Sequence, residues 1–115
     1  MSLAKIALDA AKQDWACFAS QQAAEKALKG LYQHHNAEGW GHGLDKLVIE
    51  IVDREPDLAV FRVAAKALDK CYIPTRYPNG LPSGAPADAY TEKEARQAIR
   101  YAEDIIRFCQ ARCSA

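Results

Sequence analysis

The segment from Thr91 to Arg112 constrains the fold of this chain more than any other part of the sequence. Thr91-Glu92-Lys93-Glu94 has the pattern of a capping box, in which the side chains of the first and fourth residues satisfy each other's backbone N–H groups. Apolar residues then recur at helical spacing. They are Ala95, Ile99, Ala102, Ile105, Ile106 and Cys109. This pattern predicts a long amphipathic helix over 92–112 with one face in a core.

The rest of the chain also has helical rather than strand character. β-branched residues are sparse, and no stretch alternates between apolar and polar residues. We expect further helices over residues 3–13, 14–35, 44–53 and 57–72. Asp14 is a candidate N-cap for the second helix, unless the first two form one bent helix, and Pro56 suits the first turn before 57–72. The glycine-rich stretch 36–43 predicts a turn.

These elements predict an all-α fold in a single domain over residues 1–115. Four main helices with short connections pack as an antiparallel up-and-down four-helix bundle. Lys and Arg number 15, as do Asp and Glu, so the formal net charge is zero. Zero net charge argues against a broad nucleic-acid-coating surface and leaves room for a local cationic site.

Neither a membrane segment nor a metal centre is expected. No apolar run reaches the roughly 18 residues that a membrane helix needs, and Lys5 and Asp9 interrupt the apolar N-terminus, so we expect a cytoplasmic protein. The four cysteines are then reduced thiols, which we expect to be buried and structural. Cys109 and Cys113 lack a second tight pair for zinc, even with His34 and His35 counted. We therefore predict no metal and no cofactor.

The stretch Tyr72–Pro82 combines rigid backbone, aromatic rings and a cation. It holds three of the chain's five prolines, which restrict the directions of the side chains between them. Arg76 lies between Tyr72 and Tyr77, and a planar guanidinium suits an anion or a flat ring. One interpretation is therefore a ligand site. The other is that the tyrosines cap the bundle while Arg76 pairs with a carboxylate.

Polar side chains also line the helix expected over 14–35. Gln22, Glu25, Lys26 and Lys29 recur at spacings of three and four, and Glu25 with Lys29 is a favourable i, i+4 pair. They form either a solvated face or one wall of a cleft beside Arg76.

His42 lies between Gly41 and Gly43, just before the helix expected over 44–53. An imidazole has one donor and one acceptor, so His42 either holds a neighbouring helix end or packs on Trp40. The alternative places it at the ligand site.

Three blocks in this order resemble the HEPN family (higher eukaryote and prokaryote nucleotide-binding), and most of all its small stand-alone prokaryotic members. The blocks are WACFASQQAAEKALKGL at 15–31, GHGL at 41–44 and LDKCYIPTRYP at 68–78. The resemblance implies an up-and-down bundle with a short additional helix, often homodimeric. It also implies pairing with a minimal nucleotidyltransferase in toxin–antitoxin-type systems. Functions in the family range from metal-independent RNase action to nucleotide binding and non-catalytic partner roles.

The sequence departs from the ribonuclease branch of that family, which carries Arg, then four to six residues, then His. No histidine follows Arg76. We therefore expect a non-catalytic domain that binds a nucleotide or the phosphate of RNA. Arg76 would contact the phosphate, Tyr72 and Tyr77 would frame a base, and Asp69 would orient Arg76. His42, Gln22, Glu25 and Lys26 complete the expected site.

Two alternatives stay open. The chain could be a metal-independent RNase toxin that uses Arg76 with His42 or Tyr77, because RNA cleavage needs a base for the 2′-hydroxyl and an acid for the leaving oxygen. It could also be a pure protein-interaction module, with a nucleotidyltransferase as its partner.

Overall fold

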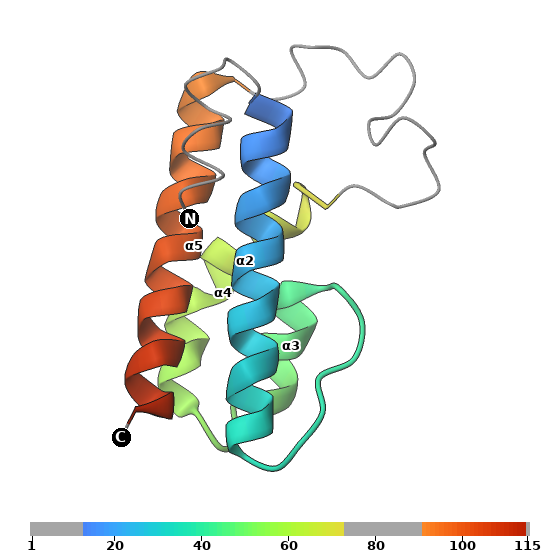
Figure 1. Ribbon diagram of the computed structural model, residues 1–115, viewed down its shortest axis with the longest axis vertical. Helices are drawn as coiled ribbons and strands as arrows, with labels where there is room; N and C mark the ends of the chain where they lie inside the picture. Colours follow the sequence, from blue (N-terminus) through green and yellow to red (C-terminus); the bar gives the residue numbers. More distant parts are fainter. Residues whose placement is uncertain (1–12, 73–90, 115) are drawn as a thin grey trace.

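The computed structural model describes residues 13–72 and 91–114, and over these ranges the chain is an all-α bundle (Figure 1). Two long helices, α2 (Gln13–His34) and α5 (Glu92–Cys113), lie side by side and run in the same direction. Between them in sequence come α3 (Leu44–Ile51), the 3-10 helix η1 (Pro56–Phe61) and α4 (Arg62–Asp69). In the figure α4 runs opposite to both long helices.

The start of α5 is the capping box expected from the sequence. The Thr91 hydroxyl accepts a hydrogen bond from the Glu94 amide at 3.0 Å, and the Glu94 carboxylate accepts one from the Thr91 amide at 2.9 Å. The apolar stripe behind it is buried except for Ile106, which is half-buried. Two backbone donors that would otherwise be unpaired are thus satisfied, which fixes where α5 begins.

The core lies between α2 and α5 and is closed by the three shorter helical segments. Its buried residues from α2 include small ones, Ala16, Cys17 and Ala24, followed by Leu28 and Leu31. α5 contributes mainly alanine and isoleucine, and these two helices share the most extensive interface in the described chain. Small side chains on both partners allow the two helix backbones to approach closely over their full length.

Two boundaries differ from those expected. The segment 57–72 is divided, because η1 precedes α4 and the chain leaves helical geometry at Phe61, with φ −94° and ψ 7°. Pro56 has no amide hydrogen, and the Leu58 amide bonds to the Glu55 carbonyl with the i→i+3 spacing of a 3-10 turn. Asp14 lies inside the first turn of α2, so its role as N-cap was wrong. The helix expected over 3–13 lies outside the described residues, apart from Gln13.

Charged side chains join the ends of α2 and α5 to the start of η1. The ends of α2 and α5 lie at the lower end of the bundle in Figure 1. Glu55 is only 7% exposed, and its carboxylate lies 2.8 Å from His35 Nε2 and 3.1 Å from Arg112 Nε. Arg112 also reaches Asp57 at 2.6 Å. This cluster, which we call the Glu55 clamp, ties the C-terminal ends of α2 and α5 to the start of η1.

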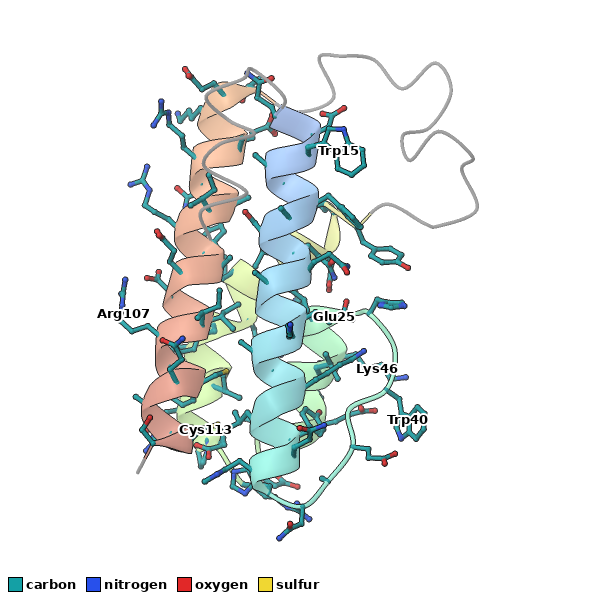
Figure 2. The ribbon with its side chains drawn as sticks, in the orientation of Figure 1. Trp15, Glu25, Trp40, Lys46, Arg107 and Cys113 are labelled. Atoms are coloured by element: carbon teal, nitrogen blue, oxygen red, sulfur yellow. The ribbon has the colours of Figure 1, made fainter. Side chains whose placement is uncertain are left out.

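The thiols follow the expected pattern with one exception. Cys17, Cys71 and Cys109 are buried, whereas Cys113 is exposed at the end of α5 (Figure 2). No helix in the described part of the chain is long and apolar enough to cross a membrane.

Candidate functional site

A carboxylate–imidazole pair lies between α2 and the loop that precedes α3. His42 Nδ1 is 3.0 Å from both carboxylate oxygens of Glu25. The Glu25 side chain is 10% exposed and that of His42 is 53% exposed, so a buried anion holds a histidine that reaches solvent. An Nδ1–H that donates to the carboxylate leaves Nε2 as the nitrogen available for a ligand.

The Glu25 carboxylate is surrounded by donors. Lys29 Nζ lies 3.0 Å from it, and Gln21 Nε2 donates to it at 3.2 Å. Burial acts to raise the pKa of Glu25, but the hydrogen bonds from Lys29, His42 and Gln21 outweigh burial and hold the pKa below its ordinary value. Glu25 is therefore a carboxylate at neutral pH.

The backbone around His42 is held by two further side chains. Gln21 Nε2 donates to the His42 carbonyl at 3.0 Å. Asp69, at the end of α4, accepts hydrogen bonds from the amides of Leu44 at 2.6 Å and Asp45 at 3.2 Å. Asp69 therefore acts as the N-terminal cap of α3, supplied from another helix. This contact fixes the backbone two residues after His42.

An aromatic row extends from this pair along α2. The ring of His42 stacks on that of Tyr72, with 4.8 Å between centroids and 17° between planes. Tyr72 is 6.3 Å from Phe18, and Phe18 is 6.0 Å from Trp15 in the first turns of α2. Trp15, Phe18 and Tyr72 are all partly exposed. Together the four rings form a stacking surface beside a polar cluster.

The structure brings together most of the described residues that sequence analysis assigned to the site. His42 contacts both Glu25 and Tyr72, and Gln22 supports this group by donating to Gln21 Oε1 at 2.6 Å. Asp69 is adjacent, but both of its oxygens bond to the α3 backbone. Arg76 and Tyr77 lie outside the described residues, so the expected pairing of Arg76 with Asp69 stays a prediction.

Lys26 lies apart from the other assigned residues, and one of the alternatives given for His42 is not observed. Lys26 is exposed and lines a hollow between α2 and α5, together with Ala23 and Ile106, rather than the site around His42. Trp40 does not pack on His42. It is 71% exposed and points away from the helices in Figure 2, and Tyr72 is the ring that His42 contacts.

Sequence analysis missed three contributors. Gln21 is fully buried and bridges Glu25 to the His42 carbonyl. Its spacing of four residues before Glu25 was the available signal. Trp15 and Phe18 are three apart on α2, which places both rings on one face of the helix. No cluster of three His, Cys, Asp or Glu side chains suited to a metal occurs within residues 13–72 and 91–114.

We predict that Glu25→Gln lowers the free energy of unfolding most at neutral pH. The folded-state pKa of Glu25 lies below its unfolded value, so its contribution is present above the unfolded pKa of about 4.3 and is lost as the pH falls through the folded pKa. Urea denaturation of both proteins between pH 7 and pH 3 should show a difference that shrinks below about pH 4. Glu38→Gln, at an exposed loop position, is the matched control. A difference independent of pH would contradict the role given to the carboxylate charge.

Comparisons with known proteins agree with this architecture. The sequence profile of the HEPN domain matches residues 1–112. The crystal structure of TT1696 from Thermus thermophilus is 43% identical with a TM-score of 0.77, and the match covers 96% of this chain and 87% of that one. An HEPN domain protein from Thermotoga maritima (tm0613) is 36% identical with a TM-score of 0.78, covering 98% and 89%. The archaeal HEPN homologue ST0689 is 34% identical with a TM-score of 0.73, covering 97% and 87%. The search of curated proteins returned no match. The profile match and these three structures show that the chain belongs to the HEPN domain family.

Proposed function

We propose that this protein binds a nucleotide or the phosphate of RNA beside His42 and Tyr72, without cleaving it. The observation that carries the proposal is the solvent-reaching imidazole of His42, held by buried Glu25 and stacked on Tyr72. Arg76, the phosphate contact expected from the sequence, follows Tyr72 by only four residues. A cationic donor beside exposed rings suits a ligand that has both a phosphate and a base.

Each part of the site has a distinct role in this proposal. When the His42 ring carries both protons, Nδ1–H donates to Glu25 and Nε2–H, together with Arg76, donates to phosphate oxygens, while Glu25 keeps the imidazole turned outward. The row formed by Tyr72, Phe18 and Trp15 offers ring surface for bases, and stacking on an aromatic side chain contributes roughly 1–3 kcal/mol per base. Asp69 serves the site indirectly, by fixing the end of α3 next to His42.

A second candidate function is metal-independent RNA cleavage, and the Glu25–His42 pair is the observation that favours it. A carboxylate that holds the Nδ1 side of an imidazole leaves Nε2 able to take a proton from a 2′-hydroxyl. Against it stands the absence of any histidine after Arg76. Cleavage also needs an acid for the leaving oxygen, and the candidate is Tyr77, which directly follows Arg76 in the sequence.

The biological setting that we propose follows the family resemblance. The chain acts beside a minimal nucleotidyltransferase in a toxin–antitoxin-type pair, as a homodimer in the cytoplasm. The hollow between α2 and α5, of about 310 Å³, supports the dimer because small or apolar residues line it beside the polar Lys26 and Gln110: Ala23, Ala27, Ile106 and Cys109. Small side chains allow a helix of a second copy to approach closely.

The binding site is tested with short single-stranded RNA and with ATP as probes. We expect Arg76→Ala and His42→Ala each to weaken binding about ten- to a hundredfold, the loss of a charge-assisted contact of roughly 1.5–3 kcal/mol. Arg76→Lys should recover only part of the loss, because the fork of donors is gone. Arg100→Ala, at an exposed position on α5, is the matched control. A sharp fall in Tm with unchanged affinity would make Arg76 a structural ion-pair partner and contradict the proposal.

The catalytic question has a direct assay. Purified protein incubated with single-stranded RNA in EDTA should leave the RNA intact, because a missing base or acid removes roughly 10²–10⁴ of rate per group. If the wild type cleaves the RNA and both Arg76→Ala and His42→Ala abolish this cleavage, His42 is identified as the catalytic base. Intact RNA together with no binding to either probe would favour the protein-interaction module instead.

The dimer is tested by light scattering. At micromolar concentration the protein should scatter with about twice the 12.7 kDa mass of one chain. Ala27→Arg places a long cation in the α2–α5 hollow and should yield monomers, whereas Ala59→Arg, at an exposed position of η1, should not. A wild-type protein that is monomeric throughout that range would overturn the dimer.

A further inference from the structure

Two buried cysteines from distant parts of the sequence meet behind the aromatic row. Cys17 on α2 is 0% exposed, and Cys71, just after α4, is 4% exposed. The residues that follow them, Phe18 and Tyr72, have their ring centroids 6.3 Å apart. Two successive residues of α2 therefore face two successive residues after α4, which brings these two stretches of backbone close together.

The two thiols also line the same hollow and lie beside each other. The neighbouring Cys71 thiol, together with burial, raises the pKa of Cys17 far above its ordinary value. Cys71 Sγ additionally points toward the Ala67 carbonyl at 4.0 Å. Both cysteines are reduced.

A hollow of about 170 Å³ lies beside this pair. Cys17 and Cys71 both line it, with Lys70, Glu94 and Tyr101 among the other lining residues. Its volume is several times the roughly 30 Å³ that one water molecule occupies, so a compact oxidant fits. The other buried thiol, Cys109, lines the separate hollow between α2 and α5.

We propose that Cys17 and Cys71 are a reversible redox pair, which a two-electron thiol oxidant converts to a disulfide that shifts Tyr72 relative to His42. With a diazene as oxidant, one thiol adds across the N=N bond. The second sulfur then displaces that adduct, the S–S bond forms, and the hydrazine leaves with both electrons and both protons. A dithiol reductant reverses the step by thiol–disulfide exchange.

The bond would change the site because its two sides are anchored differently. A disulfide brings the sulfurs to about 2.05 Å, much closer than two unbonded thiols can approach. Cys71 is then drawn toward α2, and Tyr72 moves with it. His42 stays where Glu25 and Gln21 hold it. Oxidation therefore separates the two stacked rings, and its effect on ligand affinity rests on the proposed function.

The test compares protein treated with diamide and then with dithiothreitol. We expect diamide to lower the mass by about 2 Da, a non-reducing digest to give one peptide pair joined through Cys17 and Cys71, and dithiothreitol to restore both. Because the ring of Tyr72 shields the stacked imidazole, the NMR signals of His42 should move on oxidation and return on reduction. They are assigned by their loss in His42→Ala.

The variants separate this pair from the other thiols. Cys109→Ala/Cys113→Ala leaves only Cys17 and Cys71, and this two-thiol protein should still form the bridge. Cys71→Ala on that background should form no intramolecular disulfide and show no His42 shift with diamide. Failure of the two-thiol protein and of the wild type to form a Cys17–Cys71 bond would overturn the redox pair. A bond that leaves the His42 signals unchanged would overturn its coupling to the site.

The binding measurement distinguishes this inference from the proposed function. Oxidised protein should bind single-stranded RNA about fivefold or more weakly than reduced protein, the size of one lost base stack. If the bridge forms and His42 shifts while neither form binds RNA or ATP, the redox pair stands and the proposed function falls. If reduced protein binds and no bridge forms, the proposed function stands and this inference falls.

Discussion

The close packing of α2 against α5 is the constraint on which the rest of this structure depends. Alanines at buried positions of both helices, such as Ala24 and Ala102, keep the two backbones near each other over their whole length. Once this face of α2 is committed to α5, a neighbouring face of α2 is left for α3, and α4 packs against α3 and α5. These shorter elements bring the His42 loop and Tyr72 to α2. The site is therefore a consequence of which side of α2 the core takes.

The Glu25 carboxylate is nearly buried beside the His42 loop, so its charge needs hydrogen-bond partners. A buried charge is costly unless hydrogen bonds satisfy it, and Glu25 has Lys29, Gln21 and His42 as partners. Two of these partners, Lys29 and Gln21, come from α2 itself, so they stabilise the carboxylate independently of the His42 loop. The third partner is His42, and its hydrogen bond to Glu25 sets the orientation of the imidazole. The same polar contacts that make burial of Glu25 tolerable also hold an imidazole outward.

The sequence was sufficient to predict the elements that local signals define. The capping box at Thr91 and the stripe behind it predicted α5 almost to the residue, because both signals lie within one continuous segment. The division at Phe61 was not predicted, since the apolar spacing from Leu58 to Leu68 suits an α-helix and a 3-10 turn carries no spacing of its own. The family resemblance was read from residue blocks in the correct order, and the profile match and solved structures confirm it.

The site was predictable in composition but not in arrangement. His42 and Glu25 are 17 residues apart, and no periodicity connects a loop histidine to a helix carboxylate. Lys26 was misplaced because a spacing of one residue on a helix turns a side chain by about 100°, enough to move it from one edge of α2 to another. Asp69 was assigned to the site by its proximity to Tyr72, yet its oxygens serve the backbone of α3. Which partner a carboxylate chooses depends on tertiary contacts that sequence alone does not contain.

Because of the Glu55 clamp, one end of the bundle is held more firmly than the region around His42 and Tyr72. At the clamp, one nearly buried carboxylate joins the end of α2, the start of η1 and the end of α5, so none of these can open without breaking the same ion pairs. The surroundings of His42 and Tyr72 hold together through ring stacking and partly exposed hydrogen bonds instead. Local opening should therefore need less free energy around His42 than at the clamp, and amide exchange would be graded along the bundle in the same sense. Such a gradient would let the residues around His42 rearrange on a ligand while the Glu55 clamp keeps α2 and α5 in their relative positions.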